Sequence, residues 1–245
     1  MLHACSALRL PLTLVPPAVE PKPPSTLLGI FADCAEERLE AGSTLFWQGD
    51  DAIHVFEIVE GAVRMVRILG DGRRAITGFL FAGDLIGVGA PERYLNSAEA
   101  IVPTRIRRSN RRRFTDQVSS SFALHHQLFA QLSREIAAIR SQVVLLACKT
   151  AEERVSSFLL AMARRTKAKG PPAGVVHLPM TRLDIADYLG LTIETVSRAM
   201  TRLRMQGIVA QIGRHTVAVR RPDCLAMLAA DDDRDRDKTA VCCSN

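Results

Sequence analysis

The stretch Asp184-Ile-Ala-Asp-Tyr-Leu-Gly-Leu-Thr-Ile-Glu-Thr-Val-Ser-Arg198 decides the fold of the C-terminal third of the chain. Thr181 can cap a helix that ends at Gly190, where a positive φ is expected. Thr192 can cap a second helix on the far side of this tight turn. Alternating apolar residues at 208–219 then predict a short hairpin. Helix, turn, helix and hairpin together predict a winged helix-turn-helix.

The outer face of the second helix carries side chains that match the edges of base pairs. Glu194, Ser197 and Arg198 are spaced so that they share one face. An arginine can bind guanine O6 and N7 with two hydrogen bonds, a glutamate can accept from cytosine N4, and a serine can serve either kind of group. The alternative is a solvated face with an ion pair between Glu194 and Arg198. Weaker contacts with phosphate or groove are expected from Arg182, Thr192, Thr195, Arg202, Arg214 and His215.

Residues 41–108 have the pattern of a β domain. Glycines recur between short runs in which successive side chains alternate, as in Val55–Val59 and Ala62–Leu69. Gly70-Asp71-Gly72 is a hairpin signal. Short strands at intervals of about ten residues indicate a sandwich, barrel or roll. Together with the helical C-terminal module, they predict an α+β protein.

A helix with a sevenfold apolar repeat is predicted between the two modules. No proline or glycine occurs from Arg105 to Lys169. Two apolar series form an a/d seam, and its members are Phe122, Phe129, Leu132, Ile136, Ile139, Val143 and Leu146. We expect a homodimer that pairs through this seam. The alternative is packing of the helix on its own domain, because roughly three heptads are barely enough for a coiled coil.

The composition is that of a basic globular protein. The chain has 245 residues, of which 47% are hydrophobic and 24% charged, and its net charge of +6 gives a pI of about 9.3. A basic balance favours a polyanionic partner such as nucleic acid. No apolar run approaches the roughly 18 residues of a membrane-spanning helix. We therefore expect no membrane contact. The six cysteines have neither the spacing of a zinc site nor that of a disulfide framework, so we expect a protein of the reducing cytoplasm without a metal site.

The order of these motifs resembles the Crp/Fnr superfamily of bacterial transcription regulators. Residues 184–198 look like its recognition segment, and Ala41–Phe46, Gln48–Asp50, Ile76–Phe79 and Ala82–Gly87 resemble its β-roll sensor domain. The similarity covers about residues 28–222 and is greatest to the FixK-like branch, which controls low-oxygen respiration and nitrogen-fixation genes.

The resemblance implies a fold and a set of partners. It implies a cyclic-nucleotide-binding-like β-roll, a long dimerisation helix and a winged helix-turn-helix. It also implies a probable activator that works as a homodimer on double-stranded DNA and recruits RNA polymerase. The expected operator is a TTGA-N6-TCAA-like palindrome, which Glu194, Ser197 and Arg198 would read.

These patterns divide the chain into five segments. We expect a disordered arm at 1–25, the β-roll at 26–110 and the dimerisation helix at 111–147. The winged helix-turn-helix follows at 148–222, and a tail occupies 223–245, in which the charged stretch Asp231–Lys238 is expected to be disordered.

Members of the superfamily differ in the ligand that they sense, and each ligand requires particular residues. A four-cysteine iron–sulfur cluster is rejected, because only Cys5 and Cys34 lie in the N-terminal region. A cyclic nucleotide is disfavoured, because Asp84 stands where the resemblance places a glutamate and Tyr94 where it places an arginine. The default for FixK-like proteins is no bound cofactor.

Three further alternatives stay open on the sequence alone. Haem could use His54, or His125 and His126 near the long helix. A metal enzyme built on the roll would need a tight cluster of histidines with a glutamate, whereas His54 stands alone, so we expect no enzymatic activity. Oxidation of Cys148 or Cys224 could control the protein, although a buried, inert thiol is the commoner case.

Overall fold

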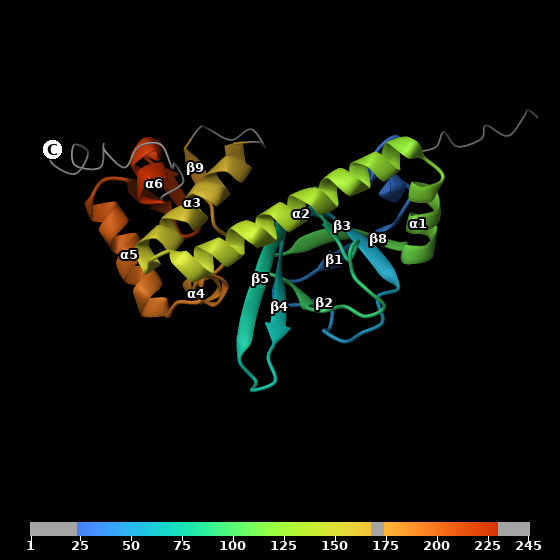
Figure 1. Ribbon diagram of the computed structural model, residues 1–245, viewed down its shortest axis with the longest axis horizontal. Coiled ribbons are helices and arrows are strands. Elements are labelled where there is room, and N and C mark those ends of the chain that lie inside the picture. Colours follow the sequence, from blue (N-terminus) through green and yellow to red (C-terminus); the bar gives the residue numbers. More distant parts are fainter. Residues whose placement is uncertain (1–23, 168–173, 230–245) are drawn as a thin grey trace, which may run out of the picture.

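The chain folds into a β-roll, a long helix and a helical C-terminal module (Figure 1). The computed structural model describes residues 24–167 and 174–229. Helix α2 (Phe122–Cys148) runs from the roll to the C-terminal module (Figure 1). The predicted α+β class, with a β-roll, a long helix and a winged helix-turn-helix, is confirmed. Within the described residues, no helix is both long and apolar enough to cross a membrane.

Two four-stranded sheets form the roll, and all their strand pairs are antiparallel. The first sheet has the order β1 (Glu36–Leu39), β8 (Thr104–Asn110), β3 (His54–Glu60) and β6 (Leu85–Ile86). The second has the order β2 (Thr44–Phe46), β7 (Ser97–Ala100), β4 (Ala62–Ile68) and β5 (Arg74–Phe81). Alternate residues point inward and build a core that includes Ile58, Val63, Ile86, Ala98 and Ile106.

The helix predicted at 111–147 is two helices in the structure, which corrects that prediction. Helix α1 spans Arg111–Ser119 and α2 begins at Phe122. Between them Ser121 is extended, and its hydroxyl accepts a hydrogen bond from the Leu124 N–H. A serine in this position satisfies one of the amides that a helix start leaves without a partner. The chain therefore turns at Ser120–Ser121 although neither glycine nor proline is present.

The C-terminal module packs helices on a small sheet. Its elements are α3 (Ala151–Lys167), β9 (Val175–His177), α4 (Arg182–Leu189), α5 (Ile193–Met205), β10 (Val209–Gly213), β11 (Thr216–Val219) and α6 (Pro222–Leu228). The antiparallel strands have the order β10-β11-β9. Leu159, Leu189, Leu203 and Leu225 are fully buried in its core.

Helix α6 corrects the prediction that residues 223–245 form a tail. Pro222 occupies its first turn, where the missing N–H would have no intrahelical partner. Cys224, Leu225 and Ala229 are buried against the module. Residues 223–229 therefore belong to the folded core. The remainder of the predicted tail, and the predicted arm up to residue 23, lie outside the described residues.

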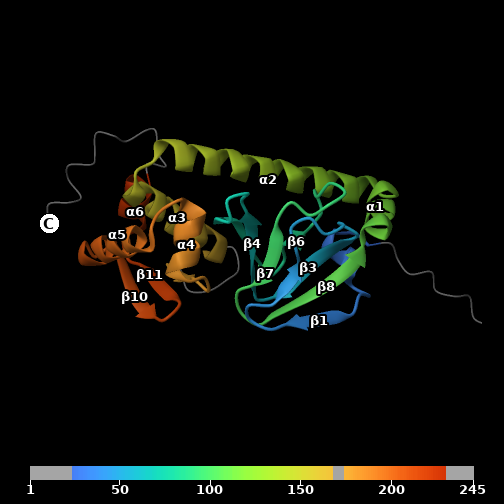
Figure 2. The ribbon, with the colours of Figure 1, turned by 90° about the horizontal axis from the view of Figure 1, so that it is seen from below.

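The N-terminal end of the described chain packs against the roll and its helices. A single turn of 3-10 helix, η1 (Leu28–Phe31), contributes the buried side chains Ile30 and Phe31. Phe31 packs against Phe114 of α1, with ring centroids 6.0 Å apart. Figure 2 shows α2 lying along one side of the molecule, with the roll and the C-terminal module both below it.

Candidate nucleic-acid interface

Two caps shape the turn between α4 and α5. Thr181 and Asp184 form a capping box, in which Thr181 Oγ1 accepts from the Asp184 N–H (3.1 Å) and the Asp184 carboxylate accepts from the Thr181 N–H (2.9 Å). Gly190 ends α4 with φ 61° and ψ 42°, a left-handed conformation that glycine adopts readily. The Leu191 N–H bonds back to the Ala186 carbonyl (3.0 Å). The predicted tight turn is thus present.

Helix α5 turns one face to the core and the other to solvent. The Thr192 hydroxyl caps the helix by accepting from the Thr195 N–H (3.2 Å), and it also bonds to the Thr195 hydroxyl (3.0 Å). Thr192 and Thr195, both predicted to contact DNA, are therefore engaged with each other at the helix start. The inward face consists of Val196, Ala199, Met200 and Leu203, all buried. This burial fixes which side chains point outward.

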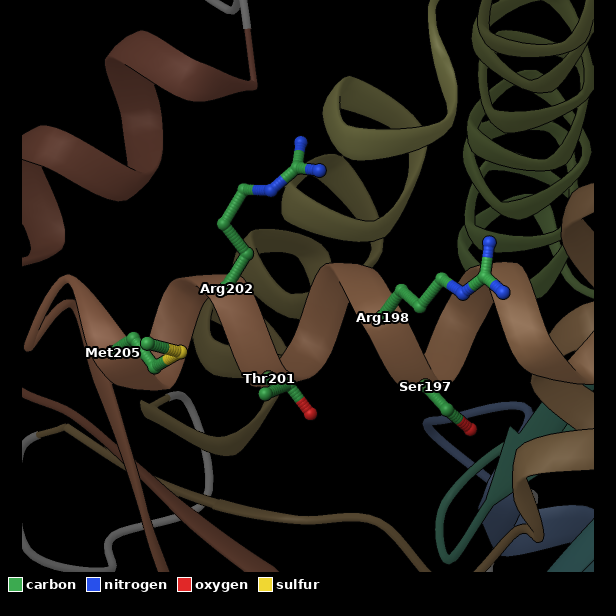
Figure 3. A pocket seen from close by; sticks show the side chains of 5 residues that line it. All are labelled: Ser197, Arg198, Thr201, Arg202 and Met205. Atoms are coloured by element: carbon green, nitrogen blue, oxygen red, sulfur yellow. The ribbon is translucent and has the colours of Figure 1, made fainter.

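The three residues predicted to read bases lie on the exposed face of α5. Ser197 and Thr201 leave one side of the helix, while Arg198 and Arg202 leave an adjoining side (Figure 3). Met205 lines the same surface and is 82% exposed. Thr201 and Met205 were not predicted, although their spacing of four and eight residues from Ser197 points to both.

Glu194 carries a negative charge at the positive end of α5. Its own backbone N–H, the Thr192 hydroxyl and the charge of Arg198 hold the pKa of Glu194 below its ordinary value of 4.5. Among the described residues, Glu194 and Arg198 form no ion pair, so the predicted alternative of a self-paired helix face is not realised. Both charges remain available to a ligand.

The predicted flanking arginines differ in their surroundings. Arg202 forms an ion pair with Glu152 of α3 (2.5 Å). Arg182 is half-buried, and burial lowers the pKa of its guanidinium. It lines a shallow groove together with Arg204 and Gln211, two residues that were not predicted. This groove joins the exposed face of α5 to the start of α4 and to strand β10.

The wing is the β10–β11 hairpin, and its turn carries the last two predicted residues. Arg214 is exposed. His215 is half-buried instead, with Nδ1 3.1 Å from the Leu178 carbonyl oxygen and its ring beside that of His177 (6.4 Å between centroids). Arg214 is therefore open to a ligand, whereas His215 contacts the body of the module.

The predicted seam lies on α2 as an uncovered apolar row. Phe122 is 89% exposed and Phe129 71%, while Leu132 is half-buried. Ile136, Ile139, Val143 and Leu146 are exposed as well. Only Leu124 and Leu145 of this helix are buried, and neither belongs to the seam. The predicted alternative, packing of the seam on its own domain, does not account for these exposures.

Asp84 and Tyr94, the two roll residues that bear on cyclic-nucleotide binding, form contacts within the chain itself. The Asp84 carboxylate accepts from the Phe81 N–H (2.8 Å) and forms an ion pair with Arg165 of α3. Tyr94 is buried, stacks on Phe46 with ring centroids 3.6 Å apart, and donates its hydroxyl proton to the His54 carbonyl (2.7 Å). Burial raises the pKa of this phenol.

The remaining candidate ligands and thiols are scattered. His54 is half-buried, and burial lowers its pKa, while His125 and His126 are exposed on α2. Over residues 24–167 and 174–229, no group of three or more histidine, cysteine or acidic side chains could hold a metal ion. Cys148 is exposed at the end of α2, and Cys224 is buried in α6.

Comparison with known proteins gives matches to both modules. A family model described as a Crp-like helix-turn-helix domain matches residues 153–228, and one described as a cyclic nucleotide-binding domain matches residues 36–121. The nitrogen fixation regulation protein FixK of Azorhizobium caulinodans is 40% identical over 183 residues, which cover 74% of each chain.

Two further matches extend this result. The FixK protein of Bradyrhizobium diazoefficiens is 37% identical over 172 residues, covering 70% of this chain and 73% of the relative. The solved structure of FixK2 from Bradyrhizobium japonicum matches with a TM-score of 0.74 at 36% identity, covering 80% of this chain and 96% of that one.

Proposed function

Because the chain belongs to the FixK-like branch of the Crp/Fnr family of DNA-binding transcription regulators, we propose that it binds a palindromic operator as a homodimer. In this proposal it activates genes of low-oxygen respiration or nitrogen fixation by recruiting RNA polymerase in the cytoplasm. It uses no iron–sulfur cluster and catalyses no reaction.

The exposed face of α5 is the observation that carries this proposal. Glu194, Ser197 and Arg198 occupy the N-terminal half of a helix that follows a tight turn, which is the part of a recognition helix that meets base edges. In each half-site of a TTGA-N6-TCAA operator, Arg198 would bind the guanine. Glu194 would accept a hydrogen bond from the cytosine that pairs with this guanine. Arg182, Arg204 and Arg214 surround this face and would contact phosphates.

The uncovered row on α2 supports a homodimer. A contiguous apolar surface of this kind is unusual on a monomer and marks an interaction site. A second copy of the same helix offers the same row, so the two seams can cover each other around a twofold axis. The half-sites of the proposed operator are about 10 base pairs apart from centre to centre, which places two recognition helices in successive major grooves about 34 Å apart.

The contacts inside the roll support a regulator that needs no cyclic nucleotide. A nucleotide would need a free acceptor for its ribose and a cation for its phosphate, but Asp84 already pairs with Arg165 and Tyr94 stands in the place of the cation. The neighbouring cation, Arg93, is exposed and is paired with Asp51, with 3.6 Å between Arg93 Nη2 and Asp51 Oδ1. These residues do not fit the ligand, and the mechanism proposed here involves none.

A fluorescence-anisotropy titration tests the proposal. Purified protein without added ligand is titrated onto a labelled TTGA-N6-TCAA duplex and onto a scrambled duplex, at two salt concentrations, with and without reductant. We expect selective binding that weakens at higher salt, because phosphate contacts release counterions. Binding that appears only with a cyclic nucleotide or haem would overturn the ligand-free mechanism. Binding only with reductant would point to Cys148, the exposed one of the two candidate thiols.

Variants separate base reading from general charge effects. Glu194→Ala and Arg198→Ala should each strongly reduce the preference for the palindrome over the scrambled duplex. Arg38→Ala is the matched control, because Arg38 is an exposed arginine of the roll whose one ion pair within residues 24–167 and 174–229 is with the exposed Glu40. Unchanged selectivity in both α5 variants would contradict the assignment of this helix as the reading element.

A further inference from the structure

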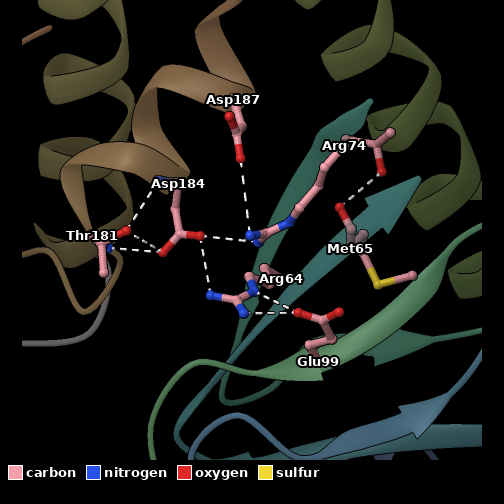
Figure 4. A network of polar contacts seen from close by, with 8 residues as sticks. Arg64, Met65, Arg74, Glu99, Thr181, Asp184 and Asp187 are labelled. Atoms are coloured by element: carbon pink, nitrogen blue, oxygen red, sulfur yellow. Dashed lines mark hydrogen bonds and ion pairs between the residues drawn. The ribbon is translucent and has the colours of Figure 1, made fainter. Parts of the chain in front are cut away.

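A buried carboxylate joins the recognition module to the roll. Asp184 lies in the first turn of α4, and its side chain is 2% exposed. Its Oδ1 accepts from Arg64 Nη1 (3.0 Å) and from Arg74 Nη2 (3.1 Å), two arginines of the roll (Figure 4). Arg64 is in β4 and Arg74 in β5, so one oxygen atom ties α4 to two neighbouring strands.

The second oxygen of the same carboxylate holds the start of α4. Oδ2 accepts from the Thr181 N–H (2.9 Å) and from the Thr181 hydroxyl (2.8 Å) (Figure 4). The capping function and the ion pairs therefore use different oxygens of Asp184. A movement of the roll arginines relative to this carboxylate would act directly on the end of a helix that leads into the recognition helix.

Each arginine also has a second acidic partner, which lies in the roll for Arg64 and in α4 for Arg74. Arg64 donates from Nε to Glu99 (2.8 Å), the residue directly across from it on β7. Arg74 has Nη1 4.0 Å from Asp187, one turn further along α4. The guanidinium fork of arginine sets direction as well as distance, so this network specifies an orientation of α4 on the roll.

The other contacts between the modules combine apolar packing with a second ion pair, which joins α3 rather than α4 to the roll. Phe79 of β5 packs against Tyr188 of α4 (5.3 Å between centroids) and Phe158 of α3 (6.2 Å). Arg165 of α3 pairs with Asp84 and lies over the Phe81 ring (4.8 Å to the centroid). Apolar contact is non-directional, so it can hold the modules together without fixing the angle between them.

We propose that Arg64 and Arg74 are positioning residues for DNA recognition, which act through Asp184 to set the orientation of the helix-turn-helix relative to the roll and α2. The inference rests on the proposed function. A palindrome is bound by two recognition helices at once, so their separation and relative angle must match the operator. The network fixes that geometry in each protomer. Its loss leaves the reading residues intact but misaligns the two helices.

The spacing between half-sites is the readout that separates positioning from reading. Affinities are measured for palindromes with spacers of five, six and seven base pairs, and for a duplex with one half-site scrambled. Each added base pair rotates one half-site by about 35° relative to the other. Wild-type protein should prefer the best spacer by more than tenfold. In Arg64→Gln/Arg74→Gln we expect at least a tenfold loss on that spacer, a preference below threefold, and a change below twofold on the single half-site.

Two additional variants keep the test interpretable. Arg64→Lys/Arg74→Lys retains both charges beside the buried carboxylate but lacks the guanidinium fork, so it should fold and still show a flattened spacer preference. Arg73→Gln is the matched control, because Arg73 neighbours Arg74 but pairs with Asp71 within the hairpin turn. It should behave as wild type.

The outcomes distinguish this proposal from the proposed function. A wild-type spacer preference in both double variants overturns the positioning role. An equal loss on the single half-site and the palindrome also overturns it, because the arginines would then act on the fold of the reading module. If wild-type protein binds no duplex selectively, the proposed function fails. Small-angle X-ray scattering without DNA then decides, since broader interatomic distances in the double variants than in Arg73→Gln support positioning and identical curves refute it.

Discussion

Replacement of Asp184 by alanine should destabilise the protein through two separable losses. The two hydrogen bonds that Thr181 donates to the Asp184 carboxylate disappear, which costs about 1 kcal/mol, whereas the Thr181 hydroxyl still accepts from the amide at position 184. The two ion pairs also disappear. Breaking a fully buried pair costs about 3–5 kcal/mol, but the Arg64 and Arg74 side chains are 20% and 30% exposed and keep Glu99 and Asp187 nearby. We therefore expect about 2 kcal/mol from this source, which is intermediate between a buried and a surface pair.

The sum of about 3 kcal/mol should lower Tm by roughly 6–12 °C in a chain of this size. Asp184→Asn retains an oxygen that can accept from Thr181 but has no charge, so it should lose only the ion-pair part, about 2 kcal/mol. Thr181→Ala should lose only the hydroxyl cap, about 1 kcal/mol. Urea unfolding followed by circular dichroism, at one fixed protein concentration because the proposed dimerisation would add to stability, measures all three.

The ranking of the variants matters more than any single value. If Asp184→Asn costs less free energy of unfolding than Thr181→Ala, the ion pairs contribute less than the hydroxyl cap, and the reasoning on this network is refuted. Asp71→Ala provides the control. It removes the exposed partner of Arg73 in the β4–β5 turn, so it should leave the urea midpoint unchanged.

Three further predictions concern reading, dimerisation and pH. Arg198→Ala should weaken binding to the palindrome by about 1–3 kcal/mol per half-site and should reduce the preference for G·C over A·T at the contacted position, where Glu194 can still read the cytosine; an undiminished preference would show that Arg198 does not read this pair. Ile139→Lys places a charge on the seam, so sedimentation equilibrium should show a shift to the monomer. Ser141→Lys is the control, because Ser141 is exposed on the same helix but off the seam, and this variant should remain dimeric. Two monomeric variants, or two dimeric ones, would argue against the seam. Burial raises the pKa of Glu57 above 4.5 despite the nearby Arg107, so the protonated form favours folding, and this contribution is lost as pH rises through the folded-state pKa. Glu57→Gln should therefore unfold at a higher urea concentration than wild type at pH 7. This difference should vanish below pH 4.5. A variant less stable than wild type at pH 7 would mean that the Glu57–Arg107 ion pair outweighs the cost of burying the carboxylate.

Local patterns predicted the reading module well because its signals are local. The caps at Thr181 and Thr192 and the turn at Gly190 lie within a dozen residues of one another. Helical spacing placed Glu194, Ser197 and Arg198 on one face, and the buried positions of α5 agree with that placement. The same spacing would have added Thr201 and Met205 if it had been followed to the end of the helix.

Contacts between distant segments left no such signal. No local pattern links Asp184 to the roll, because Arg64 and Arg74 lie 120 and 110 residues away from it in the chain. No periodicity in the sequence connects them, because the pairing depends on how the module packs on the roll. The break at Ser120–Ser121 does have a local signal, a serine that can cap a helix, whereas the prediction of one continuous helix rested on the absence of proline and glycine.

The uncovered row on α2 also bears on how the protein responds to its own abundance. If two copies must pair through this row before both half-sites can be held, the amount of active species rises with the square of the monomer concentration wherever dimers are scarce. A modest rise in synthesis, or a modest fall in degradation, would then produce a disproportionate rise in operator occupancy. Under the proposed ligand-free mechanism, in which Tyr94 stacked on Phe46 occupies the core of the roll, that dose dependence would be a sufficient switch without a small-molecule signal.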